Sequence, residues 1–263
     1  MQSTFIRSLC RVRPSMIASG CAAAAVVSAG ASALCAGAKV TNEKTLSSTK
    51  FLELMQLSYA DDEGMTRQWD MVQRKGKPRV VNVLPVLKSK STQPGDEETL
   101  LTCQFRPPMN AYVLEMPAAI LKDSESIEEC AVKCIHNETG YGATVRTTAP
   151  SACSSAGLTN ESVSLVICDV NLDDYVHEEY ITRRIGKKRR RQMTKTTVVN
   201  SESFIPSQNL DDGQFIEVKR VKIRDLQAHI DAAQREGVVA SISLQAIAAG
   251  LAMANGFGVS ARR

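Results

Sequence analysis

The chain has 263 residues, a mass of 28.6 kDa and a formal net charge of +4. Hydrophobic residues make up 43% and charged residues 23%, which is ordinary for a globular protein and excludes disorder along the whole chain. The net charge comes from residues 1–40, because the remainder holds 28 bases and 28 acids. A protein that binds nucleic acid through a generally basic body is therefore excluded.

Residues 1–40 have the composition of a targeting leader that is cleaved or disordered. Three arginines precede Ser15–Ala38, a stretch without charge that is rich in alanine. A basic, acid-free N-terminus of this kind predicts a mitochondrial transit peptide. A secretory signal or a signal anchor stays open, because the small residues of Ala25–Ala38 suit both. Alanine and glycine contribute little transfer free energy, so we expect no stable membrane span.

The body that follows predicts a mixed α/β fold. Apolar patterns predict strands at 51–59, 65–74, 79–88, 99–105, 111–116, 163–170 and 214–221. Pro85 suggests that the third of these strands lies at an edge or contains a bulge. A capping box at Ser126–Glu129 predicts the start of a helix that ends at Gly140, and two more helices are expected at 223–235 and 242–255. This order predicts a mixed sheet packed between helices.

A basic segment interrupts this pattern. Residues 176–208 read as a loop insertion, within which 181–201 carry eight bases and no acid. Such a run is either a solvated loop, a nuclear-import patch or a contact for RNA or a ribonucleoprotein. Aromatic residues are not interleaved with residues 183–195, so phosphate contact is the mechanism available for RNA.

The five body cysteines are odd in number and irregular in spacing, which argues against a disulfide framework and favours a reducing compartment.

The segment ESIEECAVKCIHNETGY, residues 125–141, resembles the Nudix box. The resemblance extends to motifs along most of the body, from about Lys50 to Phe257. They are similar to the ADP-sugar diphosphatase (ADP-ribose pyrophosphatase) branch of the Nudix hydrolases, and they read TRQWD at 66–70, QFRPPM at 104–109, EMPA at 115–118, AGLTN at 156–160 and DDGQFIEV at 211–218.

The resemblance implies an α/β/α sandwich around a mixed sheet. It divides the chain into the leader 1–40, an N-terminal strand segment 41–78 involved in dimerisation, and a Nudix domain 79–258 that contains the insertion 176–208. It further implies a homodimer in which the N-terminal strands of one subunit reach the substrate pocket of the other.

The family's functional positions can be carried over residue by residue. For substrate binding the resemblance implies that Phe51 and Trp69 clamp the adenine. It implies that Arg74 and Arg106 contact the nucleotide and that Glu115 lines the terminal ribose. For catalysis and Mg²⁺ it implies Glu138, with the backbone of Ala118 as a further metal ligand.

The catalytic positions depart from the family pattern. Cys134 and Asn137 stand where relatives carry box glutamates, and Gln214 stands where they carry a loop glutamate. A thiol and an amide are poor Mg²⁺ ligands, and an amide is no general base. Glu125 fits a structural role that closes the box. Acids that could substitute are Asp211 and Asp212, and less readily Glu161 and Glu217.

Two hypotheses remain open from the sequence. In the first, the protein binds an ADP-sugar such as ADP-ribose, with hydrolysis to AMP and a sugar phosphate weak or lost and Mg²⁺ weakly bound or absent. In the second, it is a non-catalytic Nudix-fold scaffold subunit that contacts RNA or a ribonucleoprotein through residues 183–195.

Overall fold

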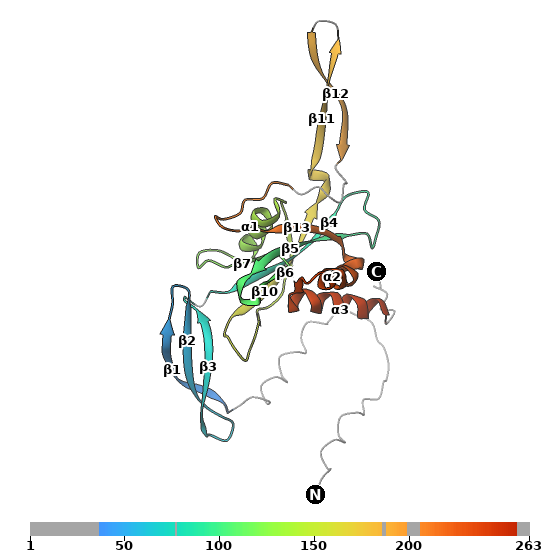
Figure 1. The fold of residues 1–263 in the computed structure, drawn as a ribbon. Helices are drawn as coiled ribbons and strands as arrows, with labels where there is room; N and C mark the ends of the chain where they lie inside the picture. The colour runs from blue at the N-terminus through green and yellow to red at the C-terminus, as the bar shows by residue number, and fades with distance from the viewer. Residues whose placement is uncertain (1–36, 77, 186–187, 199–205, 257–263) are drawn as a thin grey trace, which may run out of the picture. The chain divides into compact units, whose positions relative to one another are not determined.

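The computed structural model describes residues 37–76, 78–185, 188–198 and 206–256 (Figure 1). Most of the predicted leader lies outside these ranges. The chain divides into two compact units. The first consists of the chain up to Glu43 together with Leu57–Trp69, and the second consists of Lys44–Gln56 together with the chain from Asp70 onward. Among the described helices, none has the length and apolar character needed to cross a membrane.

Three N-terminal strands form a sheet of their own, in the order β1-β2-β3. They are β1 (Lys39–Ser48), β2 (Leu52–Ala60) and β3 (Thr66–Arg74). β2 and β3 start and end within one residue of the predicted strands. β1 was not predicted, because every residue in it is exposed and its sequence therefore shows no alternation between a buried and a solvent face.

A larger mixed sheet has the order β14-β6-β5-β4-β10-β8, with β13 on β5, β7 on β4 and β9 on β10. Its strands are β4 (Val80–Lys88), β5 (Glu98–Arg106), β6 (Ala111–Glu115), β7 (Ala118–Ile120), β8 (Thr144–Thr148), β9 (Ala152–Cys153), β10 (Ser162–Asn171), β13 (Glu217–Lys222) and β14 (Val239–Ala240). β10 runs parallel to β4, whereas β5 runs antiparallel to β4 and to β6. The predicted mixed sheet is confirmed.

Helices cover both faces of this sheet (Figure 1). α1 (Ile127–Thr139) packs on one face, and α2 (Leu226–Arg235) and α3 (Ile242–Gly256) pack on the other. Successive side chains of β5 point to opposite faces of the sheet. Leu100 therefore belongs to the core under α1, and Leu101 belongs to the core under α2 and α3. Short 3-10 turns connect elements at Pro107–Met109 (η2), Leu172–Asp174 (η3) and Ile223–Asp225 (η4). The α/β/α sandwich expected from the resemblance is therefore present.

Pro85 lies in an inner strand of the sheet, so the predicted edge position was wrong. Its Cα pairs with that of Cys168 in β10 on one side of β4. On the other side β4 changes partners, because β7 pairs with Val80–Asn82 and β5 pairs at Leu87. Pro85 lies between these two pairings, where the missing N–H costs no ladder hydrogen bond.

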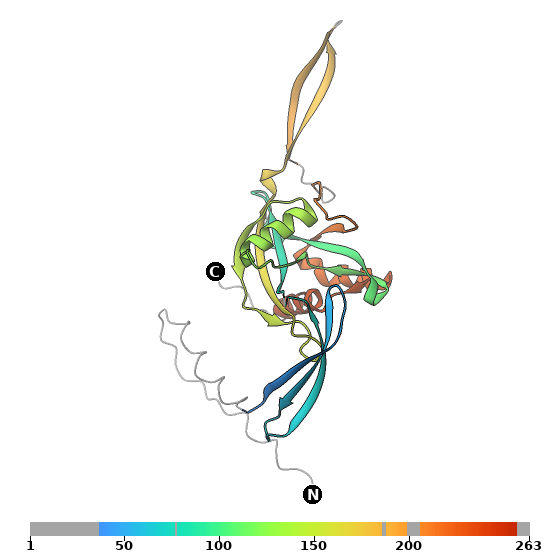
Figure 2. The ribbon, with the colours of Figure 1, turned by 90° about the vertical axis from the view of Figure 1, so that its left-hand side faces the viewer.

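The insertion is a β-hairpin rather than a loop (Figure 2). β11 (Val176–Ile185) and β12 (Lys188–Val198) form a two-stranded antiparallel sheet separate from the other described strands. In its backbone register Arg183 is opposite Arg190, and Arg184 is opposite Arg189. The mixed polar and basic sequence gave no hydrophobic alternation from which these strands could be predicted.

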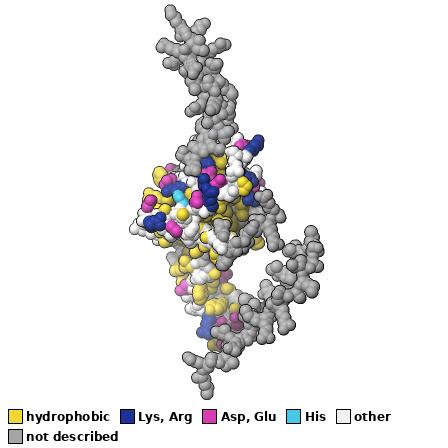
Figure 3. All heavy atoms as spheres, turned by 90° about the vertical axis from the view of Figure 1, so that its right-hand side faces the viewer, with side chains coloured by type: hydrophobic (Ala, Val, Ile, Leu, Met, Phe, Trp, Pro, Cys, Tyr) yellow, Lys and Arg dark blue, Asp and Glu magenta, His cyan; other side chains and the backbone are white. Residues whose placement is uncertain are grey.

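Charges on the described surface are mixed in sign. On the face drawn in Figure 3, Lys and Arg side chains lie interspersed with Asp and Glu side chains. This distribution agrees with the neutral body expected from the composition.

Candidate functional site

α1 begins and ends at the residues that the sequence predicted. The Ser126 hydroxyl accepts a hydrogen bond from the backbone N–H of Glu129 at 3.1 Å, and the Glu129 carboxylate accepts one from the backbone N–H of Ser126 at 3.0 Å. Gly140 ends the helix with a left-handed φ of 76°, and its N–H donates to the carbonyl of His136. These caps fix which residues face the sheet and which face outward.

An ion pair joins the segment before α1 to the middle of the helix. Lys133 Nζ lies 2.6 Å from Glu125 Oε1. This one hydrogen bond, donated by Lys133, lowers the pKa of Glu125 and raises the pKa of Lys133. Glu125 is thus the ion-pair partner of Lys133, and this contact holds the segment that precedes α1 against the helix.

The three positions that the resemblance assigns to box glutamates differ in burial. Cys134 is buried in the core under α1, with Cys130 and Cys168 in the same cluster. Burial raises the pKa of the Cys134 thiol well above its usual value, so it stays protonated. Asn137 is exposed and Glu138 is partly buried. Of these three positions, Glu138 alone carries a carboxylate on the accessible side of the helix.

Glu138 lies against the segment that joins β6 to β7. The backbone N–H of Ala118 donates to its Oε2 at 3.4 Å. Burial is the main cause that raises the pKa of Glu138 to about 7, and the negative charge of Glu115 raises it further. The Ala118 hydrogen bond and the positive charge of Arg106 act in the opposite direction and lower this pKa. Near neutral pH this carboxyl group is therefore divided between its charged and neutral forms.

Arg106 and Glu115 form a close pair beside Glu138. The Nε and Nη2 atoms of Arg106 lie 3.0 and 2.5 Å from Glu115 Oε2. In the antiparallel register Arg106 is opposite Ala111 and Glu115 is opposite Thr102, so the long side chains of Arg106 and Glu115, rather than direct cross-strand pairing, make this contact. Two of the substrate-binding residues that the resemblance implied are thus partners in this structure.

Arg74 lies at the end of β3 and is also paired. Its Nε is 2.6 Å from Glu161 Oε2, and the neighbouring Gln73 accepts a hydrogen bond from Asn160 at 3.1 Å. Phe51 precedes β2 with 66% of its surface exposed, and its carbonyl accepts a hydrogen bond from the Lys75 backbone. The pairing of Arg74 with Glu161 was not foreseen, because 87 residues separate the two in sequence.

Trp69 lies in the other compact unit, near the end of β3. Its exposed fraction is 48%, which is high for a residue of this size.

Gln214 closes a tight turn of its own segment. Its backbone N–H donates to the Asp211 carbonyl at 3.0 Å, and its side-chain oxygen accepts from the Asp211 N–H at 3.3 Å. Asp211, Asp212 and Glu217 are exposed, and Lys219 lies 3.7 Å from Glu217. Ala119, at the position of the box's opening glycine, packs partly buried against the core under α1.

Comparison with known proteins decides the family. The chain is 33% identical over 197 residues to the ADP-sugar pyrophosphatase of Mus musculus, which covers 73% of this chain and 77% of that protein. The chain belongs to the ADP-sugar pyrophosphatase branch of the Nudix hydrolases.

Other similarities agree with this Nudix assignment. The ADP-ribose pyrophosphatase of Saccharomyces cerevisiae is 26% identical over 215 residues, covering 80% of this chain and 81% of that protein. The fold resembles that of a crystal structure of an ADP compounds hydrolase with a TM-score of 0.52 at 13% identity, covering 86% of this chain and 99% of that one. No protein-family model matches the chain.

The residues at the Nudix metal position do not fit Mg²⁺ well. Mg²⁺ prefers oxygen ligands in octahedral geometry, and Nudix enzymes generally use such a divalent metal. Within the described residues, no group of three or more His, Cys, Asp or Glu side chains is arranged to hold a metal ion. Glu138 contributes a carboxylate, the Ala118 carbonyl could contribute an oxygen, and Cys134 contributes a buried neutral thiol.

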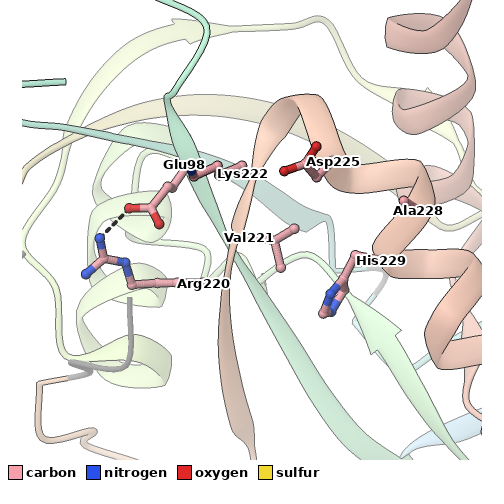
Figure 4. Close-up of a pocket in the computed structure, with 7 residues that line it drawn as sticks. All are labelled: Glu98, Arg220, Val221, Lys222, Asp225, Ala228 and His229. Atoms are coloured by element: carbon pink, nitrogen blue, oxygen red, sulfur yellow. Dashed lines mark hydrogen bonds and ion pairs between the residues drawn. The ribbon is translucent and has the colours of Figure 1, made fainter. Parts of the chain in front are cut away.

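An open cavity lies beside β13 and α2 (Figure 4). It has a volume of about 400 Å³ and is lined by residues of β13 and α2, with Glu98 of β5 and its buried ion-pair partner Arg220 among them. Glu98 and Arg106 are the two ends of β5, which places them roughly 27 Å apart. This cavity is therefore separate from the Arg106–Glu115 pair.

Proposed function

We propose that this Nudix protein binds an ADP-sugar such as ADP-ribose, and that its hydrolysis to AMP and a sugar phosphate is weak or absent. The observation that carries the proposal is the outer side of α1. There the neutral Asn137 lies beside Glu138, whose pKa of about 7 leaves it only partly charged, and Cys134 is turned into the core. Binding groups persist where catalytic charges do not.

The binding groups suit a nucleotide diphosphate and its riboses. The guanidinium groups of Arg74 and Arg106 are held by single carboxylates, from Glu161 and Glu115, and are 45% and 42% exposed. A phosphate can replace a carboxylate at a guanidinium fork without a new geometry. A carboxylate released in this way is a hydrogen-bond acceptor for ribose hydroxyl groups. Phe51 and Trp69 offer exposed rings for adenine stacking.

The chemistry of hydrolysis lacks support from these residues. A bound divalent metal would neutralise the pyrophosphate and activate water. Glu138 offers one carboxylate for such a metal, and Gln214 cannot accept a proton as a general base. Loss of a single well-placed electrostatic group in an active site typically costs about 10²–10³ in rate. Loss of several groups from one site therefore supports strongly impaired turnover.

Calorimetric titration with ADP-ribose tests the binding part of this proposal. Arg106→Ala removes a phosphate partner and should weaken binding by roughly tenfold or more. Arg224→Ala is a matched control, because Arg224 is exposed, pairs with Asp96 at 2.7 Å and lies beyond β13. Equal effects from both variants, or no binding by the unmodified protein, would contradict the proposal.

A homodimer is the second element of the proposal. β1–β3 and the turns beside them leave apolar side chains exposed, namely Val40, Leu46, Phe51, Leu52, Leu54, Met65 and Trp69. So many exposed apolar groups in a short segment favour an interface. Sedimentation equilibrium should give a dimer for the full chain and a monomer, or a weaker dimer, for Leu52→Glu/Leu54→Glu. A monomeric unmodified protein would contradict it.

The scaffold function is the alternative candidate, favoured by the backbone register of the insertion. Like charges opposite each other destabilise an antiparallel pair, and an isolated hairpin is only marginally stable in water. The Arg183–Arg190 and Arg184–Arg189 positions would therefore gain from an anionic partner. The test is binding of a single-stranded RNA 20-mer between about 50 and 200 mM salt. A steep salt dependence that Arg189→Glu/Arg190→Glu abolishes supports it, and no binding at 50 mM refutes it.

A further inference from the structure

The C-terminal turn of α1 receives its caps from a segment far away in sequence. The last four carbonyl groups of a helix have no partner within the helix. Here the carbonyl of His136 accepts the Gly140 N–H, the carbonyl of Asn137 accepts the Asn209 N–H at 2.8 Å, and the carbonyl of Glu138 accepts from Gln208 Nε2 at 2.6 Å. Two of these three bonds come from the end of the insertion, namely from its last residue, Gln208, and from Asn209 directly after it.

Gln208 bridges two elements with one side-chain amide. Besides the Glu138 carbonyl, its Nε2 donates to the carbonyl of Ile216 at 3.0 Å, just before β13. A second amide contact lies alongside, since Asn209 Nδ2 is 3.3 Å from Asn137 Oδ1. Asn137 thus serves as a hydrogen-bond partner for the segment that returns from the insertion.

Residues 206–209, called the return segment from here on, also pack against the end of α1. A Cβ atom on Gly140 would lie 2.6 Å from the Ser207 carbonyl oxygen and 2.8 Å from the Pro206 backbone, so only glycine fits there. The segment that enters the insertion contacts the same region. The Tyr175 ring meets the Tyr141 ring edge-on at 4.9 Å, and the Tyr175 hydroxyl accepts a hydrogen bond from the Gly142 N–H. Both ends of the insertion therefore contact residues 137–142.

We propose that Gln208 is a positioning residue through which the insertion keeps the last turn of α1, and with it Glu138, in place. Helix ends fray when their carbonyls lose their partners, because the terminal turn then has too few bonds to offset its conformational entropy. Glu138 is the next-to-last residue of α1 and lies in the turn that would fray. A consequence for nucleotide affinity rests on the proposed function.

Native-state hydrogen exchange on the full chain tests this assignment without any nucleotide. Gln208→Glu keeps the size of the side chain but replaces its donor with a carboxylate that faces two carbonyl oxygens. We expect the amides of residues 138–141 and of Asn209 to exchange roughly 2–10-fold faster, which corresponds to the loss of one hydrogen bond. Gln93→Glu is the matched control, since Gln93 is exposed in a loop and its side-chain amide makes a long 3.5 Å bond to the Ser91 carbonyl.

The exchange pattern decides between a local and a general role. Acceleration confined to residues 138–141 and the return segment, with β4 and β10 unchanged, supports the assignment. Unchanged exchange in that turn overturns it. Equal acceleration in β4 and β10 also overturns it, because Gln208 would then support the whole fold.

Binding of ADP-ribose to the same variant is a second readout. The expected result is weaker binding for Gln208→Glu and unchanged binding for Gln93→Glu. Full affinity in a variant whose last turn has frayed would overturn the link to the nucleotide site. If the unmodified protein binds no ADP-ribose, the proposed function fails, while the exchange result still decides the role of Gln208.

Discussion

Burial and hydrogen bonding act in opposite directions on Glu138. Burial favours the neutral acid and raises its pKa to about 7, whereas the Ala118 N–H and the charge of Arg106 favour the carboxylate. The unfolded chain releases this proton near the ordinary value of 4.5. Between these two values the folded state retains a proton that the unfolded state has lost, so the free energy of unfolding falls as pH rises.

Glu138→Gln should therefore stabilise the protein above pH 7 in metal-free buffer. The amide cannot ionise, so the variant avoids a penalty on the order of 1–3 kcal/mol that the carboxylate incurs at high pH. Thermal unfolding at pH 4.5 and pH 8 provides the measurement. A gain in Tm over the unmodified protein that is the same at both pH values would show that the pKa of Glu138 is not raised.

Cys134 illustrates why the missing glutamates cannot all be restored by substitution. Its side chain is only 3% exposed and belongs to the core under α1. Cys134→Glu should lower the free energy of unfolding by about 3 kcal/mol or more, because a carboxylate there has no partner. Cys134→Ala should cost about 1 kcal/mol. Denaturant unfolding compares the two, and similar losses would mean that position 134 reaches solvent.

At the scale of elements, the end of α1 depends on Gly140 for two separate reasons. Its φ of 76° strains any residue with a Cβ, and that Cβ would also meet the Ser207 carbonyl and Pro206. Gly95 has a similar φ of 87° with no atom near its Cβ position, so it isolates the first effect.

Gly140→Ala should thus destabilise the protein by at least 2 kcal/mol and Gly95→Ala by about 1 kcal/mol. The difference measures how firmly the return segment packs on the helix. Chemical denaturation of both variants gives the comparison. Equal losses would indicate that residues 206–207 move away at no cost.

Elements with a local signal were predicted well from the sequence. α1 followed from its capping box and from Gly140, and β4 and β10 followed from their apolar runs. β1 and the β11–β12 hairpin were missed because neither shows the alternation that marks a strand with a buried face. The edge position predicted from Pro85 was wrong, because the sequence does not reveal that β4 changes its pairing partner from β7 to β5.

For the candidate site, the sequence offers individual positions but not the contacts between them. The resemblance implied Arg106, Glu115 and Glu138 individually. The ion pairs of Glu115 with Arg106 and of Glu161 with Arg74 come from side-chain placement that the sequence does not specify, because Glu115 is opposite Thr102 in the strand register and Glu161 is 87 residues from Arg74. The contact of Gln208 with the Glu138 carbonyl likewise joins residues that are 70 apart in sequence, so no spacing rule could reveal it.

At the scale of the whole molecule, the Nudix sandwich carries a basic hairpin, and we propose that it keeps groups for binding a nucleotide while lacking charges needed for its hydrolysis. Its membership in the ADP-sugar pyrophosphatase branch supplies the expected substrate class. The central claim is that recognition of the nucleotide has been separated from its hydrolysis. Because this claim compares binding with hydrolysis, both need to be measured on the same protein under the same conditions.

The most direct measurement is single-turnover AMP release from ADP-ribose, at a protein concentration above the Kd found by calorimetry, with Mg²⁺ and then with Mn²⁺. The account predicts saturable binding with AMP release at least 10²-fold slower than in the mouse relative assayed in parallel. AMP release at the rate of that relative, abolished by Glu138→Gln, would contradict it and restore this chain to the active hydrolases of its family.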